Sequence, residues 1–146
     1  MPSVDFYVLD GADDRVRWRF ACRQIEQAYL DGQRVLVCLD DDSQLAAFDE
    51  LLWTFGDRSF VPHEPLGAVA DWETTPVHLG TAAAAAEGVG LIVNLAGAVP
   101  ASIAGCERVL EIIDADPDRR AAGRLRYRSY RDLGLKPNTH QSPAGA

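Results

Sequence analysis

Residues 34–39 read Arg34-Val35-Leu36-Val37-Cys38-Leu39, and Asp40-Asp41-Asp42-Ser43 follows directly. A continuous apolar run without alternation is typical of a strand that a parallel sheet buries on both faces. Aspartate and serine are preferred N-cap residues, so the acidic stretch predicts the start of a helix. This helix is predicted to reach about Phe55, and its spacing turns three residues inward: Leu45, Phe48 and Leu52.

A similar strand-then-helix unit precedes this one. Val4, Phe6 and Val8 alternate with Asp5 and Tyr7, which predicts a strand that ends at residues 9–11. A helix is predicted from about residue 13 to 31, with Gly32 as its stop. Its inward face has apolar residues at spacings of three and four: Trp18, Ala21, Cys22, Ile25 and Ala28.

The second half of the chain continues the alternation. Short strands are predicted at residues 59–63, 77–79 (an edge strand), 90–95 and 109–113, and a short helix at 100–106. The last helix begins at residues 114–117, since proline is tolerated in a first turn, and ends near Gly134. This order predicts an α/β fold, one open and largely parallel twisted sheet with helices on both faces. We expect a single domain over residues 1–139 and a flexible tail over 140–146.

Composition and motifs predict a globular protein of the cytoplasm. The 146 residues are 47% hydrophobic and 25% charged, and the three cysteines form no CxxC pair. A disulfide framework or structural zinc site is therefore not expected, and a reducing compartment fits. The first nine residues lack the basic start and apolar run of a secretory signal. No apolar run approaches the roughly 18 residues that a membrane span requires.

Charge is divided unevenly along the chain. The net charge of −8 opposes general affinity for nucleic acid. Residues 119–136, however, hold seven of the fourteen basic residues and one acid, a local charge of +6, which leaves −14 elsewhere. A direct nucleic-acid binder that uses this basic segment is an alternative, but the acidic remainder opposes it.

No catalytic residue, metal site or cofactor is predicted. No phosphate-binding loop occurs, and the acidic residues 10–14 after the first strand would repel a pyrophosphate. Asp10 and Asp40 are expected at neighbouring strand ends, where carboxylates can hold Mg²⁺, so a Mg²⁺-dependent receiver-like or phosphotransfer domain is another alternative. The helix that follows Asp40 favours solvated carboxylates that cap it. The chain also has only one lysine, Lys136, which is not near a strand end.

The basic segment predicts an anion-binding helix face. Arg120, Arg124, Tyr127 and Arg131 fall within about 60° of one another on a helix, with Arg128 at the border. Arg120, Arg124 and Arg128 follow one another at i+4 and repel each other, which favours an external anion such as a carboxylate or phosphate. The opposite side is predicted to pack on the sheet through Ala122, Leu125, Ser129 and Leu133.

Five blocks in this order resemble the chi subunit of bacterial DNA polymerase III holoenzyme, over residues 4–139. They are Val4-Asp5-Phe6-Tyr7-Val8-Leu9-Asp10, Gly32-Gln33-Arg34-Val35-Leu36-Val37, residues 45–53 ending in Asp49-Glu50-Leu51-Leu52-Trp53, Ser59-Phe60-Val61-Pro62-His63, and Arg124-Leu125-Arg126-Tyr127-Arg128-Ser129-Tyr130-Arg131. The resemblance implies a Rossmann-like fold without a nucleotide site and a non-catalytic accessory protein of the clamp loader.

The resemblance also implies two partners, with neither a nucleic acid nor a membrane among them. One is the psi subunit, whose contact surface would include Trp53, Phe60 and Pro62. The other is the acidic C-terminal tail of single-stranded DNA-binding protein, which ends in an apolar residue and a free carboxylate. The family's tail-binding positions match Arg120, Arg124, Tyr127 and Arg128, with Ile113 in the apolar pocket. The helical spacing above adds Arg131 to this set.

Overall fold

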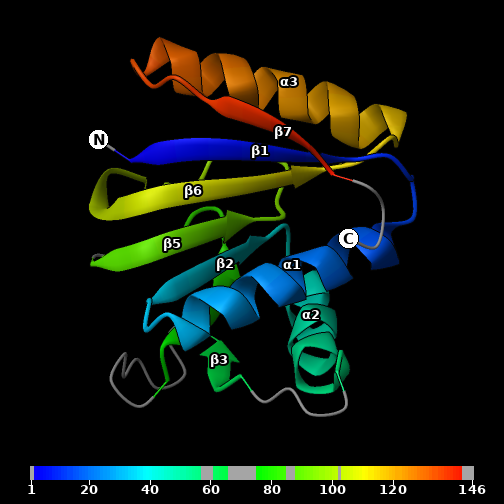
Figure 1. Cartoon of the computed structure of the whole chain (residues 1–146), viewed down its shortest axis with the longest axis vertical. Coiled ribbons are helices and arrows are strands. Elements are labelled where there is room, and N and C mark those ends of the chain that lie inside the picture. Colours follow the sequence, from blue (N-terminus) through cyan, green and yellow to red (C-terminus); the bar gives the residue numbers. More distant parts are fainter. Residues whose placement is uncertain (1, 57–60, 66–74, 85–87, 102, 143–146) are drawn as a thin grey trace.

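The computed structural model describes residues 2–56, 61–65, 75–84, 88–101 and 103–142. Its strands are β1 (Ser3–Leu9), β2 (Val35–Leu39), β3 (His63–Pro65), β4 (Val77–Thr81), β5 (Val89–Asn94), β6 (Cys106–Ile113) and β7 (Asn138–Ser142). Its helices are α1 (Asp14–Leu30), α2 (Asp42–Thr54) and α3 (Pro117–Asp132), with a 3-10 turn over Ile103–Gly105. Within these residues the strands form one sheet in the order β3-β4-β2-β5-β6-β1-β7 (Figure 1). Every neighbouring pair is parallel, which confirms the predicted α/β fold.

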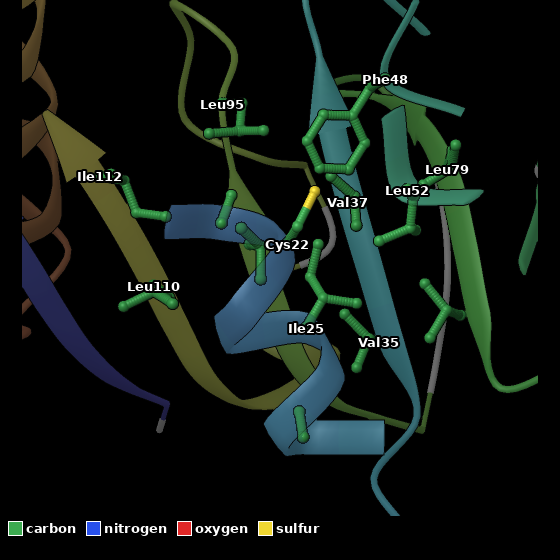
Figure 2. Packing of buried hydrophobic residues seen from close by; sticks show 14 of the residues in the cluster. Cys22, Ile25, Val35, Val37, Phe48, Leu52, Leu79, Leu95, Leu110 and Ile112 are labelled. Carbon is green, nitrogen blue, oxygen red and sulfur yellow. The ribbon is translucent and has the colours of Figure 1, made fainter. Parts of the chain in front are cut away.

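Helices cover both faces of the sheet. On one face α1 and α2 pack against alternate residues of the central strands, and Figure 2 shows Cys22 and Ile25 of α1 beside Val35 and Val37 of β2. On the other face Tyr130 of α3 packs with residues of β1, β2, β5 and β6. Because both faces are covered, β2 is buried along its whole length, as its apolar sequence predicted.

Each helix is preceded by an N-cap aspartate whose side chain accepts a hydrogen bond from a backbone N–H of the first turn. Asp13 accepts from Arg15 N at 3.0 Å, Asp41 from Gln44 N at 2.8 Å, and Asp116 from Arg119 N at 2.9 Å. These caps satisfy amide groups that have no partner within the helix. The predicted helix starts are therefore confirmed to within one or two residues. None of the helices in the described part of the chain has the length and apolarity of a membrane crossing.

The sheet differs from the prediction at both edges. Residues 77–79 belong to β4, which is not an edge strand because β3 lies outside it. Residues 140–142, predicted to be tail, belong to β7, which pairs with β1 from Asp5↔Asn138 to Leu9↔Ser142. β7 was missed because its sequence shows no apolar alternation. It is held instead by main-chain pairing with β1 and by His140, whose ring stacks on that of Tyr7 with centroids 4.8 Å apart. Residues 143–146 lie outside the described residues, and the predicted helix at 100–106 is only the 3-10 turn before β6.

The prediction of the inward face of α3 was wrong. Leu125 and Leu133 are 62% and 57% exposed. The residues of α3 that are buried against the sheet are Gly123, Arg126 and Tyr130. A buried arginine and a glycine do not register as an apolar face, so the hydrophobic pattern pointed to the wrong side of the helix.

Candidate functional site

An apolar pocket of about 90 Å³ lies where α3 meets the β7 edge of the sheet. Four elements line it: β1 (Phe6, Val8), β6 (Ile113), α3 (Gly123, Arg124, Tyr127) and β7 (Thr139). Three of the predicted tail-binding residues, Ile113, Arg124 and Tyr127, thus meet at one pocket. Phe6, Val8, Gly123 and Thr139 were not predicted. Thr139 was missed because β7 was not recognised, and the others resemble ordinary core residues in sequence.

Tyr127 and Arg124 form the α3 side of this pocket. The Tyr127 ring packs on the Phe6 ring with centroids 5.4 Å apart, and its hydroxyl donates to the Pro137 carbonyl at 3.5 Å. Arg124 is exposed, and within the described part of the chain no acceptor or acidic group pairs with it. A free guanidinium beside an apolar pocket suits a ligand that carries both a carboxylate and an apolar group.

The other predicted arginines lie along the same helix but do not line the pocket. Arg120 is half-buried and lies one turn before Arg124. Arg128 and Arg131 are exposed and line a separate hollow together with Asp132. These three residues add positive charge beside the pocket, where exposed charges act over about a Debye length.

Two further basic residues of this segment are neutralised inside the protein. Arg119 donates to both oxygens of Asp114, at 2.9 and 2.7 Å, and Arg126 donates to Glu111 at 3.0 Å. Burial acts to raise the pKa of Asp114, but the hydrogen bonds from Arg119 and from the Asp116 amide outweigh it and hold this pKa below its ordinary value. The positive charge available to a partner is therefore that of Arg120, Arg124, Arg128, Arg131 and Lys136.

A buried polar cluster determines which side of α3 faces the sheet. The Glu111 carboxylate is fully buried on β6 and accepts from Arg126 Nε at 3.0 Å, Tyr130 Oη at 2.6 Å and Asn94 Nδ2 at 2.8 Å. Burial raises the pKa of both Glu111 and Tyr130, whereas Arg126 acts to lower both. Turning Leu125 inward would leave the Glu111 carboxylate without two of its three donors, which is costly for a buried charge. The sequence signal for this cluster is a single acid between Leu110 and Ile112.

The acidic residues at the strand ends lie in a mixed polar site. Asp40 accepts from the Gly97 amide at 2.7 Å, and Asp41 caps α2. A cavity of about 200 Å³ at this end of the sheet is lined by Asp14 and Asp40, but also by Arg17, Arg119 and Arg126. Guanidinium groups in the same cavity disfavour Mg²⁺. Among the described residues, no group of three or more His, Cys, Asp and Glu side chains is arranged to hold a metal ion.

The three cysteines are buried and poorly suited to nucleophilic chemistry. Burial raises the pKa of Cys22 and of Cys38 to about 12 and that of Cys106 to about 11. The reactive form of cysteine is the thiolate, so at neutral pH these side chains remain inert thiols.

Two of the three residues predicted to contact psi lie at the other side of the molecule, Trp53 in α2 and Pro62 just before β3. Trp53, near the end of α2, is 42% exposed, and its ring packs on that of His63 with centroids 4.1 Å apart. His63 is buried and its ring nitrogens contact the Val61 carbonyl at 2.6 Å and Asp49 at 3.1 Å, which fixes the surface under Trp53. Pro62 is half-buried, and Phe60 lies outside the described residues. Figure 1 shows α2 and β3 toward one edge of the sheet and α3 and β7 toward the other.

A solved structure shares this fold. One structural match is to the crystal structure of T4 UvsW, with a TM-score of 0.67 and 9% sequence identity, over 97% of this chain and 42% of that one. The chain thus spans less than half of that protein. At this identity the likeness shows the fold alone.

Sequence comparison finds relatives that match over nearly their whole length. "DNA polymerase III subunit chi" of Pseudomonas aeruginosa is 33% identical over 143 residues, which cover 98% of this chain and 99% of the relative. The proteins of the same name from Escherichia coli and Haemophilus influenzae are 26% and 22% identical and cover 95% and 94% of this chain, and 97% and 95% of the relatives. Residues 1–138 match the family model for "DNA polymerase III chi subunit, HolC". The chain therefore belongs to the DNA polymerase III chi subunit family.

Proposed function

We propose that this protein is a non-catalytic adaptor of the replisome that binds two partners at once. One is the acidic C-terminal tail of single-stranded DNA-binding protein, and the other is the psi subunit of the clamp loader. Membership of the chi subunit family supports an accessory role in DNA polymerase III. The observation that carries the tail assignment is the apolar pocket with the unpaired Arg124 beside it.

The tail peptide would contribute two groups at its end. Its last side chain enters the pocket between Ile113, Tyr127 and Phe6, and burial of one apolar side chain is worth about 1.5–3 kcal/mol. Its terminal carboxylate accepts hydrogen bonds from Arg124, and a hydrogen bond to a charged group is worth about 1.5–3 kcal/mol. These two contacts together predict that binding requires a free chain end.

The acidic residues that precede the chain end would lie near the remaining arginines of α3. Arg120, Arg128 and Arg131 attract them without a fixed geometry, since Arg128 and Arg131 are exposed. Exposed charge pairs contribute little affinity each, and they act mainly on the association rate and its salt dependence.

For psi we propose a contact through Trp53, Pro62 and Phe60. An exposed tryptophan held in place by a buried histidine is a typical anchor of a protein interface. Six strand-to-strand spacings separate β3 from β7, which corresponds to about 29 Å at 4.8 Å each. At this separation the two partners do not compete, and simultaneous binding links the clamp loader to protein-coated single strands by effective concentration.

Calorimetry with a synthetic acidic peptide tests the tail site. We expect Arg124→Ala to weaken binding by about 1.5–3 kcal/mol, and replacement of the peptide's carboxylate by an amide to weaken it similarly. The matched control is Arg15→Ala, an arginine on α1 that is 88% exposed and lies away from the pocket. If Arg124→Ala binds within twofold of the wild type, or if the amide binds as well as the acid, the assignment is wrong.

A further inference from the structure

Gly123 occupies an unusual position for a glycine. It lies in the middle of α3, where glycine costs about 1 kcal/mol relative to alanine. It is buried, faces β6 and lines the apolar pocket. Neither a turn nor a positive φ explains it, since Gly123 is not among the glycines with a left-handed backbone.

The contacts around Gly123 explain the missing side chain. A Cβ atom at this position would lie 3.0 Å from Cγ2 and 3.3 Å from Cδ1 of Ile113. Ile113 lines the same pocket, so the Cβ would project into the gap between α3 and β6 beside the pocket. Glycine therefore lets the helix approach the strand closely and leaves this space empty.

The volume at stake is a large part of the pocket. A methyl group takes up about as much space as a water molecule in the liquid, roughly 30 Å³. The pocket measures about 90 Å³, so the volume of a methyl group is about a third of the volume of the pocket. This pocket is smaller than an engineered cavity of about 150 Å³ that holds a benzene ring, so a change of one methyl group is large relative to the space that a ligand can occupy.

We propose that Gly123 is a specificity-determining residue, which sets the depth of the pocket and thereby the size of the terminal apolar side chain that the protein accepts. This inference rests on the proposed tail site. It assigns a role in ligand selection to a position with no charge and no functional group.

The test measures preference rather than affinity alone. Acidic peptides that differ only in their last residue (Phe, Leu, Val or Ala) are titrated into wild-type protein and into Gly123→Ala. We expect the preference for Phe over Ala to fall by about fourfold or more in Gly123→Ala, the equivalent of one buried methylene group. A purely structural role of Gly123 would weaken all four peptides by the same factor.

Two further variants keep the result interpretable. Ala121→Gly makes the reverse exchange at an exposed position of α3 and should leave the preference unchanged. Ile113→Val removes Cδ1 from the pocket and should raise the preference for the largest residue, so it also tests the idea if Gly123→Ala does not fold.

The outcomes separate this inference from the proposed function. If wild-type protein binds none of the peptides, the tail site and the role of Gly123 both fail. If it binds them but neither Gly123→Ala nor Ile113→Val changes the ratio of Phe to Ala affinity, only the specificity role is overturned. An increased preference for Phe in Gly123→Ala would also overturn it, since the helix would then have moved outward and widened the pocket.

Discussion

Tyr130→Phe tests whether the buried polar cluster holds α3 in its observed rotation. The Tyr130 side chain is fully buried, and its hydroxyl donates to Glu111 Oε2 at 2.6 Å. The substitution removes that one donor and keeps the ring, which packs edge-on against Phe6 with centroids 5.9 Å apart. Glu111 keeps its contacts with Asn94 and Arg126.

The expected loss of stability follows from these contacts. A hydrogen bond to a charged group contributes about 1.5–3 kcal/mol, and the near-isosteric exchange adds little cavity cost. We therefore expect the free energy of unfolding to fall by about 2 kcal/mol. For a protein of this size this corresponds to a decrease in Tm of roughly 4–8 °C.

Urea unfolding monitored by circular dichroism measures this change, with an unchanged m-value as evidence that only stability differs. The matched control is Tyr127→Phe, the same exchange one turn earlier, where the hydroxyl makes a single 3.5 Å contact to the Pro137 carbonyl. It should cost about 0.5 kcal/mol, because the bond is long and its acceptor is neutral. If Tyr130→Phe costs no more than Tyr127→Phe, the cluster does not hold the helix.

The pH dependence of this loss has a definite sign. Burial raises the pKa of Glu111, and the Tyr130 hydroxyl counteracts part of that effect because it stabilises the ionised form. Without the hydroxyl the folded-state pKa of Glu111 rises further, so the variant takes up its proton at a higher pH than the wild type. Once Glu111 is protonated, the lost bond is one to a neutral acceptor, which is weaker. The stability difference between the two proteins should therefore shrink as the pH is lowered.

Three other results are expected. Arg119→Met should destabilise the protein at pH 7 by about 1–3 kcal/mol, because the buried Asp114 loses its guanidinium partner and keeps only the hydrogen bond from the Asp116 amide. The pKa of Asp114 is lowered in the folded state, so this loss in urea titrations should fade as the pH falls below the ordinary aspartate value of 3.8. Trp53→Ala should retain the native circular dichroism spectrum but abolish co-purification with psi; an unfolded variant would instead mark Trp53 as a core residue. Tail-peptide affinity measured by calorimetry should agree within about twofold with and without bound psi, and displacement of psi by saturating peptide would contradict the adaptor proposal.

Much of the fold could be predicted from sequence because its signals are local. The apolar run of β2 marks a doubly buried strand, and Asp13, Asp41 and Asp116 mark helix starts within one turn of the residues they cap. A strand-helix alternation then leaves few arrangements other than a parallel sheet. The edge of that sheet was less predictable, since β7 is held by main-chain pairing with β1 rather than by an apolar pattern.

For the candidate site, the sequence by itself determined that α3 carries an unusual concentration of arginine and that Arg124 and Tyr127 share one side of it, and the resemblance added Ile113. Only the tertiary structure decided that these three share a pocket with Gly123 and Thr139, and that Arg119 and Arg126 are neutralised by Asp114 and Glu111. The physical reason is that helix rotation depends on contacts between distant segments. Helical spacing indicates which residues of α3 share a side, but the buried carboxylate on β6 determines which side faces the sheet.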